Sequence, residues 1–499
     1  MSPPTTGPTI TPQPPTGPDR RHRLLVLAIC CFSLFIVGLD NTVVNVALPS
    51  IQRELDAPAS GLQWIIDAYT LVLASLLMLS GSVADRIGRR RVFRTGLLVF
   101  VLGSLLCSLA PSLGWLVSFR VVQAVGGSML NPVAMSIITN TFTDRRERAQ
   151  AIGVWSGVVG LSMALGPLIG GFLVNSAGWQ SIFLINIPVG LAAFVLARRH
   201  IPESRAPHPR RLDPVGQVLM LLLLGCGTAA IIEGPGYGWT SPLILALAAV
   251  ALTSLVLLPL WERRVAEPLI DPRFFHSAPF TGATLTAVCA FAALGGFLFV
   301  NTLYLQVVRG YSPVQAGLWT LPMAVMTLIA APLSGRIVGR SGPRLPLVAA
   351  GTALAASGLL LTRLAADSPP TLLIVSYALF GLGFGLVNAP ITNAAVSGMP
   401  LAQAGVAAAV ASTSRQVGQS LGVAVIGTVV VSSVAGPVAT GLAPASHAGW
   451  WIVTGLGLTL VLLGLVTTTA WAEGTAARVA DRLDPEGAGV RNGGVERLR

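Results

Sequence analysis

The stretch GSVADRIGRRRVFR, Gly81 to Arg94, places one aspartate and five arginines between two apolar runs. Charge is scarce elsewhere, because charged residues make up 10% and hydrophobic residues 53% of the 499-residue chain. Soluble domains carry about a quarter of their residues as charged side chains that cover the surface. The composition therefore excludes a soluble globule and predicts an integral membrane protein, with this stretch as a turn at the edge of the bilayer.

Apolar runs of roughly 20 to 28 residues recur along the whole chain, long enough as helices to cross a hydrocarbon core of about 30 Å. No run shows the alternation that is typical of a transmembrane β-strand. We therefore expect an all-α integral membrane protein with fourteen transmembrane helices, near residues 24–48, 62–84, 92–111, 114–141, 149–176, 180–200, 214–233, 241–261, 279–307, 314–338, 345–365, 371–397, 403–434 and 449–472.

The arginines are divided unequally between the two sets of loops that these spans create. One set contains the opening stretch, both chain ends and most other loop arginines, whereas the other set contains Arg53, Arg309 and Arg363. Because cytoplasmic loops carry the excess of basic residues, the pattern predicts a multi-pass protein of the cytoplasmic membrane with both termini in the cytoplasm. The net charge of +12 forms no continuous basic face, so we expect no nucleic-acid partner.

The basic turn has a second copy later in the chain. When Gly81 is aligned with Gly335, the segment GSVADRIGRR falls on GRIVGRSGPR. The matching pairs are Arg86 with Arg340, Gly88 with Gly342, and Arg90 with Arg344. A turn that recurs on the same side of the membrane indicates two related helical halves, as in transporters built from repeats.

In these residues the chain resembles the major facilitator superfamily, whose turn between spans two and three carries G-x-x-x-D-R-x-G-R-R/K. The residues that fill this motif are Gly81, Asp85, Arg86, Gly88, Arg89 and Arg90. Further stretches resemble the fourteen-span drug/proton antiporter branch, the multidrug efflux transporters of that family: Leu39–Pro49, Gln63–Leu71, Arg120–Ser128 and Gly157–Gly171. The second copy of the turn departs from the motif, with Gly339 in the place of Asp85.

The resemblance implies a major-facilitator fold, in which two six-helix bundles surround a central cavity and two extra spans are inserted between them. The first residues are rich in proline and threonine and uncharged until Asp19, which predicts a disordered cytoplasmic tail at 1–23. The resemblance implies an N-terminal bundle at 24–200. A linker with the two extra transmembrane helices would occupy 201–277. The C-terminal bundle would occupy 278–472, followed by a cytoplasmic tail at 473–499.

Four charged residues lie in the body of the predicted spans, away from the span ends: Asp40, Asp67, Arg120 and Arg415. Such a side chain at membrane depth costs several kcal/mol unless it faces a cavity or a partner, so each is a functional candidate. At about 1.5 Å per residue, the first three lie in one layer outside the midplane. Arg120 could simply neutralise one carboxylate as a buried pair. Alternatively, these residues couple transport to protons. Asp40 would then be the main proton or substrate carboxylate and Asp67 the second, and Arg120 would adjust the proton affinity of both.

With both carboxylates ionised, this layer has a net charge of minus one, which favours cationic or zwitterionic substrates. Gln123, one turn after Arg120, is expected to hydrogen-bond between helices rather than to touch substrate. Arg415 could counter an anionic group or bond to carbonyls of a neighbouring helix. Tyr69 and Trp155 are weaker candidates for lining an apolar cavity, because core packing is the commoner role.

Span five carries a string that resembles the signature of antiporters in this family: Gly160, Gly166, Pro167, Gly170 and Gly171. Small residues allow another helix to approach closely, and proline kinks a helix. We therefore expect this span to seal one route at the interface between the halves.

The basic turn is expected to do more than anchor the chain. Since Gly339 replaces Asp85 in the second copy, the acidic residue is not needed for topology. We expect Asp85 to pair across the bundle interface or with nearby arginines such as Arg89. Such a latch would stabilise one state of a transport cycle.

These features favour a proton-coupled antiporter that exports small amphiphilic compounds, such as drugs, antibiotics and lipophilic cations, by alternating access. A dedicated exporter of one endogenous metabolite or lipid, and a non-transporting membrane receptor or scaffold, are the alternatives. No catalytic triad or phosphate loop is present, so we expect no enzyme and a proton gradient rather than a cofactor. The five cysteines lie in apolar runs without metal-ligand spacing, so no metal is expected. The protein should function as a monomer in the lipid bilayer.

Overall fold

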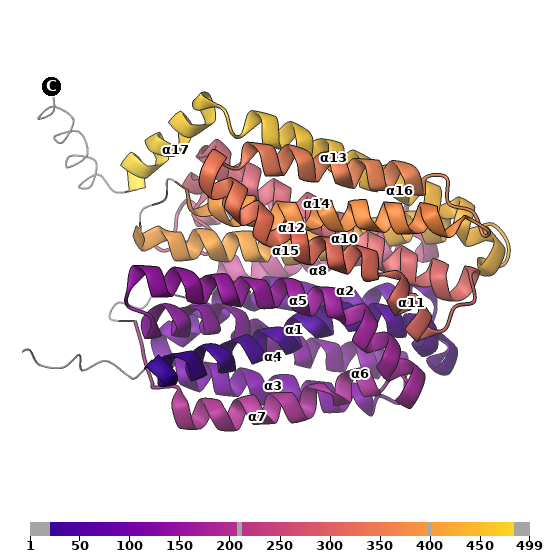
Figure 1. Cartoon of the computed structure of the whole chain (residues 1–499), viewed down its shortest axis with the longest axis horizontal. Helices are drawn as coiled ribbons and strands as arrows, with labels where there is room; N and C mark the ends of the chain where they lie inside the picture. The colour runs from indigo at the N-terminus through magenta and orange to yellow at the C-terminus, as the bar shows by residue number, and fades with distance from the viewer. Residues whose placement is uncertain (1–19, 207–211, 398, 400, 484–499) are drawn as a thin grey trace, which may run out of the picture.

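Twelve helices among the described residues are long and apolar enough to cross a membrane. The computed structural model describes residues 20–206, 212–397, 399 and 401–483 (Figure 1). Inside two of its helices, the side chains at 145, 146, 149, 156, 159, 160, 163, 164, 401, 402, 404 and 405 lie outside that description. The protein is an all-α, multi-pass membrane protein.

The N-terminal part of the chain forms α1 (Arg20–Leu55), α2 (Ala59–Ile87), α3 (Arg89–Ser108), α4 (Leu113–Thr141), α5 (Arg145–Ala177), α6 (Ser181–Leu184) and α7 (Asn186–His200). α6 and α7 follow one path across the membrane, because together they form a single apolar span, Ser181–His200. The hairpin α8 (Pro214–Tyr237) and α9 (Pro242–Glu262) comes next.

The C-terminal part begins with the short helix η1 (Pro272–His276). It continues with α10 (Ala278–Leu303), η2 (Tyr304–Val308), α11 (Pro313–Trp319), α12 (Leu321–Ser341), α13 (Arg344–Leu361), α14 (Pro370–Val396), α15 (Leu401–Ser432), α16 (Val438–Val466) and α17 (Ala470–Leu483). Proline stands in the first turn of several of these helices, where its missing N–H has no intrahelical partner to lose.

The long helices form two layers that face each other along their length (Figure 1). In the layer α1–α7, α3 packs on α4, α1 on α5 and α2 on α4. In the layer α10–α16, α10 packs on α15, α12 on α14 and α13 on α16. We call these the N-terminal and C-terminal layers. α2 and α15 meet where the two layers join.

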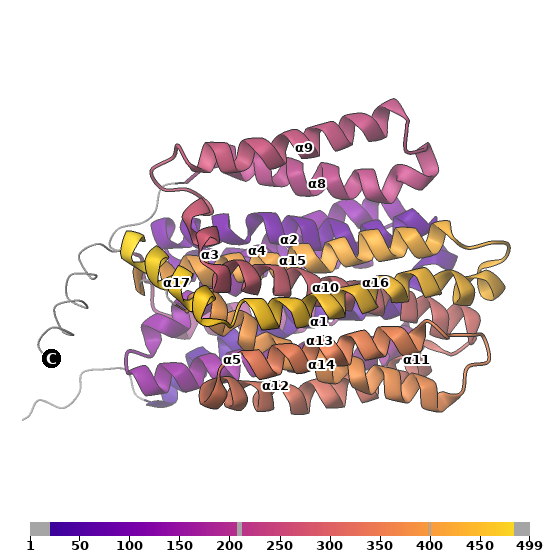
Figure 2. The same cartoon turned by 90° about the horizontal axis from the view of Figure 1, so that it is seen from above.

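The α8–α9 hairpin lies beside this junction, and α8 contacts both α2 and α15 (Figure 2). Two hydrogen bonds tie α8 to α2. The Trp64 indole N–H donates to Glu233 Oε1 at 2.7 Å, and the Gln217 amide donates to the Ser75 carbonyl, also at 2.7 Å. The inserted pair is therefore held by polar contacts as well as by its apolar faces.

Consecutive long helices run in opposite directions through the layers. As a result, the α2–α3 turn with its arginines lies at the same end as the start of α1 and the end of α17 (Figure 1). We call this end the basic end, and the other the opposite end. α5 runs from the basic end to the opposite end, and α11 starts at the opposite end.

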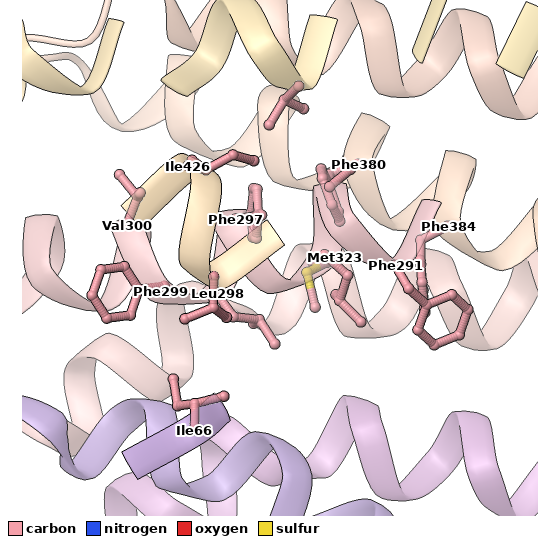
Figure 3. Packing of buried hydrophobic residues seen from close by; sticks show 14 of the residues in the cluster. Ile66, Phe291, Phe297, Leu298, Phe299, Val300, Met323, Phe380, Phe384 and Ile426 are labelled. Atoms are coloured by element: carbon pink, nitrogen blue, oxygen red, sulfur yellow. The ribbon is translucent and has the colours of Figure 1, made fainter. Parts of the chain in front are cut away.

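Aromatic side chains fill much of the C-terminal layer. Phe297 of α10 stacks on Phe380 of α14 with ring centroids 4.0 Å apart. Phe291 and Phe384 of the same two helices form an edge-to-face pair at 5.1 Å. Ile66 of α2 belongs to the same buried cluster (Figure 3). The apolar core is therefore continuous from one layer to the other.

The C-terminal helices differ from the predicted spans. α16 begins at Val438 rather than at 449. The sequence predicts the later start because Gly441 and Pro444, which lie in the first turns of α16, are residues typical of loops. Where a tail was expected from 473, the chain continues as α17 to Leu483. α17 contacts α10, and the Ala278 N–H donates to Thr475 Oγ1 at 2.8 Å.

α5 and α15 coincide in position with the predicted spans 149–176 and 403–434. The segment Leu165–Ala177 of α5 is apolar but shorter than the twelve candidate membrane spans. The total of fourteen spans stays a prediction. The predicted tails fall largely on 1–19 and 484–499, outside the described residues.

Candidate functional site

A buried ion pair joins α4 to α1 in the N-terminal layer. Arg120 Nη1 of α4 lies 2.5 Å from Asp40 Oδ2 of α1, and the two side chains are 1% and 0% exposed. Arg120 also donates to Gln123 Oε1 at 2.7 Å and, through Nε, to the Ile65 carbonyl at 3.2 Å. Charges removed from water are stable only when paired and hydrogen-bonded, and this guanidinium is both.

The second oxygen of Asp40 is bonded as well. Oδ1 accepts from the side-chain amides of Gln123 at 2.8 Å and Asn186 at 2.9 Å. Ser104 Oγ of α3 accepts from the same two amides, at 2.8 and 3.3 Å. Asp40 is thus held by α4 and α7, and Gln123 makes the interhelical hydrogen bonds that the sequence analysis expects of it.

Aromatic rings enclose the pair. The Tyr69 ring of α2 lies 4.1 Å from the Arg120 guanidinium carbon, and the Phe183 ring lies 5.7 Å from it. Both rings are fully buried, and the Tyr69 hydroxyl has no hydrogen-bond partner among the described residues. Tyr69 therefore packs on the cation instead of facing an open space. Cation–π contacts of this kind contribute more when they are desolvated.

Asp67 lies apart from this pair, in the contact between α2 and α15. Its side chain is 0% exposed, and Oδ1 accepts a 3.4 Å bond from Thr70 Oγ1. The Ser420 hydroxyl of α15 is close enough to interact with the carboxyl. Even so, Asp67 Oδ2 and Ser420 Oγ have no hydrogen bond of ordinary geometry within the described chain. The structure thus joins Asp40 to Arg120 and separates Asp67 from both.

One turn before Asp67, Gln63 bridges the two layers. Its amide donates to the carbonyls of Val423 and Ala424 on α15 at 3.1 and 3.4 Å, and to Thr428 Oγ1 at 3.3 Å. The side chain is buried. The sequence analysis placed Gln63 in a family-like stretch without giving it a role. The contacts make it the polar link between α2 and α15.

At the opposite end, the glycines of α5 lie against α1 and α11. A methyl group placed on Gly166 would meet Thr42 of α1, and one on Gly170 would come within 3.0 Å of the Val43 carbonyl oxygen. A methyl group on Gly171 would overlap the Pro313 carbonyl of α11. These residues belong to the predicted antiporter string. Gly160, its first member, lies outside the residues whose surroundings are described.

The contact between α5 and α11 is reciprocal, because a methyl group on Gly317 would overlap the carbonyl of Pro167. A cross-layer hydrogen bond from Gln306 to the Val46 carbonyl, at 2.8 Å, lies at the same end. Because small residues let the two backbones touch, the layers are closely packed here.

Toward the basic end the same helices are open. A methyl group placed on Gly153 or Gly157 of α5 would have no described heavy atom within 4 Å beyond its own helix and chain neighbours. The same holds for Gly335 and Gly339 of α12. Among the described glycines of these helices, a close approach of the two layers therefore occurs at the opposite end and not at the basic end.

The basic turn is organised within the N-terminal layer. Arg89 donates to Asp85 Oδ1 twice, from Nε at 2.9 Å and from Nη2 at 2.7 Å. Arg86 is exposed, and Gly81 packs against Pro132 of α4. Of the two partners considered for Asp85, the structure shows the nearby arginine.

Glu203, after α7, completes this turn and was missed by the sequence analysis. Its Oε1 accepts from the Arg90 N–H at 3.0 Å, and its Oε2 lies 3.9 Å from Arg90 Nε and 3.6 Å from Arg91 Nε. Gly88 has φ +122°, and a Cβ there would lie 2.6 Å from Glu203 Oε1, so only glycine fits. A carboxylate at the start of α3 also suits the helix dipole.

Two sequence candidates lie on the helices that face across the layers. Arg415 of α15 is half-buried, donates from Nη2 to Thr392 Oγ1 at 2.7 Å, and lies 5.9 Å from the Phe291 ring. Trp155 of α5 is half-buried, and its indole N–H has no partner among the described residues. The described part of the chain contains no group of His, Cys, Asp and Glu that could hold a metal ion.

Comparison with known proteins agrees with this architecture. The sequence model of the Major Facilitator Superfamily matches residues 30–423. The chain is 36% identical over 412 residues to multidrug resistance protein Stp of Mycobacterium tuberculosis, covering 83% of this chain and 76% of that protein. It is 38% identical to the tetracenomycin C resistance and export protein of Streptomyces glaucescens, covering 82% and 76%. It is also 38% identical to puromycin resistance protein pur8 of Streptomyces alboniger, covering 86% of each.

Solved structures share the fold. One is a bacterial homologue of the human lysosomal transporter Spinster, described as inward-facing and unoccupied. It has a TM-score of 0.61 and 18% identity, and the match covers 93% of this chain and 99% of the other. A second is a bacterial homologue of the human peptide transporters PepT1 and PepT2, with a TM-score of 0.61 and 15% identity over 92% and 99% of the two chains.

Proposed function

Because the chain belongs to the Major Facilitator Superfamily, a family of transporters rather than enzymes, we propose that it is a proton-coupled antiporter that exports small amphiphilic compounds. Three relatives that cover most of the chain are named for resistance to drugs or antibiotics. We place the protein in the cytoplasmic membrane as a monomer with fourteen spans, and the basic end with both termini in the cytoplasm.

The observation that carries the proposal is the unequal packing between α5 and the successive helices α11 and α12. The layers touch backbone to backbone at the opposite end and lack such contacts at the glycines of the basic end. A transporter that works by alternating access closes one end while the other is open. The structure is then the state that opens toward the cytoplasm, where an exported compound enters.

Asp40 is the proposed proton site. In the state described here, Arg120 and two amides satisfy both oxygens of its carboxylate. Protonation would remove the charge on which the Arg120 contact depends, so gain or loss of a proton changes how α1 is held against α4. Asp67 is the proposed second site, because its buried carboxyl has an unbonded oxygen at the α2–α15 junction.

Export and coupling can be tested separately. Cells that lack their major efflux pumps and express the protein should survive higher concentrations of several amphiphilic antibiotics, puromycin among them. In everted membrane vesicles that hold an inward-acid pH gradient, adding such a compound should dissipate the gradient, and a protonophore should abolish accumulation of the compound. Asp40→Asn should remove the dissipation, whereas Asp367→Asn, at an exposed site of the opposite end, should not.

Three results would each contradict a part of the proposal. Resistance to one compound alone would favour the dedicated exporter, an alternative that the single-compound names of two relatives also support. No gradient dissipation with any compound, in vesicles that contain the inserted protein, would favour the receptor or scaffold. Unchanged dissipation in Asp40→Asn would leave export in place and remove Asp40 as the proton site.

A further inference from the structure

We infer that Arg415 binds an anionic group of the exported compound, and that the protein therefore prefers amphiphilic acids and zwitterions over compounds that carry only positive charge. This inference rests on the proposed export function. It concerns the C-terminal layer, whereas the proposed proton sites lie on α1 and α2 of the N-terminal layer.

The surroundings of Arg415 are incomplete for a charged group. The contacts of its guanidinium are one hydroxyl, Thr392 Oγ1 at 2.7 Å, and the Phe291 ring at 5.9 Å. Its Nε is buried and has no hydrogen-bond partner among the described residues. No carboxylate of the described chain lies within 4.0 Å of it. A half-buried cation without a counter-charge is partly desolvated without compensation, so an anionic partner from outside the chain would be stabilised here.

Arg120 offers a comparison within the same chain, because it is the other arginine in the body of the predicted spans. Its guanidinium contacts a carboxylate, an amide oxygen, a backbone carbonyl and an aromatic ring. The same type of side chain is therefore fully paired in one layer and unpaired in the other. A guanidinium offers five N–H donors in a planar fork that matches a carboxylate or phosphate in two parallel bonds.

Arg415 lies at the level where α15 contacts the N-terminal layer. The next residue, Gln416, accepts a 3.4 Å hydrogen bond from Asn41 of α1, so this part of α15 faces the N-terminal layer. Thr392 is exposed. In α12, on the same layer, Gly335 and Gly339 meet no described atom within 4 Å of an added methyl group. A compound that enters from the basic end can thus reach the free donors.

The neighbouring surface suits an amphiphilic acid. The Phe291 ring lies 5.9 Å from the guanidinium carbon and also forms the edge-to-face pair with Phe384 (Figure 3). An apolar ring system can lie against these helices while its acidic group bonds to Arg415. Across the layers Asp40 is neutralised by Arg120, and Asp67 is fully buried. The accessible charge between the layers is then positive. The net charge of minus one that was counted from the sequence includes Asp40, Asp67 and Arg120 but not Arg415.

A matched pair of dyes tests the preference. Rhodamine 110 carries a free carboxylate, and rhodamine 123 is the methyl ester of the same molecule. Binding is measured by fluorescence anisotropy on the purified full-length protein, and export is measured in cells. The wild type should bind rhodamine 110 at least about tenfold more tightly than rhodamine 123. Arg415→Gln should remove that difference and leave the affinity for the ester within about twofold, whereas Arg415→Lys should retain part of it.

Arg363→Gln is the control, because it removes the same charge from an exposed site at the opposite end and should preserve the preference. An equal loss of affinity for both dyes in Arg415→Gln, or tighter binding of the ester by the wild type, would overturn the inference. If the carboxylate is bound through Arg415 but neither dye is exported, the export function fails and the binding site stands. If both dyes are exported and both bind with equal affinity, the export function stands and the Arg415 site is refuted.

Discussion

Replacing Gly171 with alanine should open the opposite end of the molecule. The added methyl group would overlap the Pro313 carbonyl oxygen of α11 and lie 2.9 Å from its carbonyl carbon and 3.0 Å from Val314 Cα. Since carbon atoms in contact lie about 3.5 to 4.0 Å apart, α5 and α11 must separate by about 1 Å at this point. Overpacking of this kind costs about 1 to 3 kcal/mol.

The cost falls on the state in which the two layers touch and is absent once they separate. If the protein exchanges between two states, a cost of about 1 to 3 kcal/mol shifts the equilibrium by about 5- to 150-fold toward the state that is open at the opposite end. The shift can be measured as a distance between spin labels on exposed residues of the two layers. Arg53 of α1 and Thr440 of α16 are suitable positions, after the free cysteines have been replaced.

Gly157→Ala is the matched control on the same helix, because no described atom lies within 4 Å of its added methyl group. Both substitutions raise helix propensity by up to about 1 kcal/mol, so this contribution cancels in the comparison. We expect a longer label distance and slower export in Gly171→Ala, and neither change in Gly157→Ala. Identical distance distributions in the two variants would show that the glycine contact does not hold the layers together.

Three further predictions follow from hydrogen bonds. Asp40→Asn should leave Arg120 buried without a counter-charge, lower the free energy of unfolding by about 3 to 5 kcal/mol and lower the melting temperature in detergent; an unchanged melting temperature would contradict the pair. Gln63→Leu should weaken the α2–α15 contact and increase hydrogen exchange of α15 amides, and unchanged exchange would exclude the bridge. Glu203→Gln should raise protease sensitivity at the α2–α3 turn and slow export while the protein stays inserted; wild-type cleavage rates would argue against that role.

The membrane class and the helical architecture could be predicted from composition and from the length of the apolar runs, because lipid leaves the backbone few alternatives to a helix. Helix ends were harder to predict. The first turns of α16 contain glycine and proline, and α17 has the polar composition of a tail. In both cases tertiary contacts decide the structure, and a single sequence does not report them.

The candidate site was predicted in part. The positions of Asp40 and Arg120 along their helices predict that the two side chains lie at the same depth in the membrane, and the structure pairs them. Depth says nothing of the direction in which a side chain points around the helix axis, so Asp67 was grouped with them although it faces α15. Asn186 and Ser104 were missed because uncharged polar residues are common inside spans. Only their convergence on one carboxylate distinguishes them.

The inserted hairpin is attached unequally to the two layers. Its hydrogen bonds to α2 are short, both 2.7 Å, whereas its bond to the other layer, from Thr428 of α15 to the Ile231 carbonyl, is 3.4 Å long. If the layers rock as the proposed function requires, α8 cannot follow both. We expect α8 to move with the N-terminal layer and to slide over α15. Each turnover would then also move the α8–α9 hairpin through the surrounding lipid. The viscosity and thickness of the bilayer would then influence the transport rate through the α8–α9 hairpin.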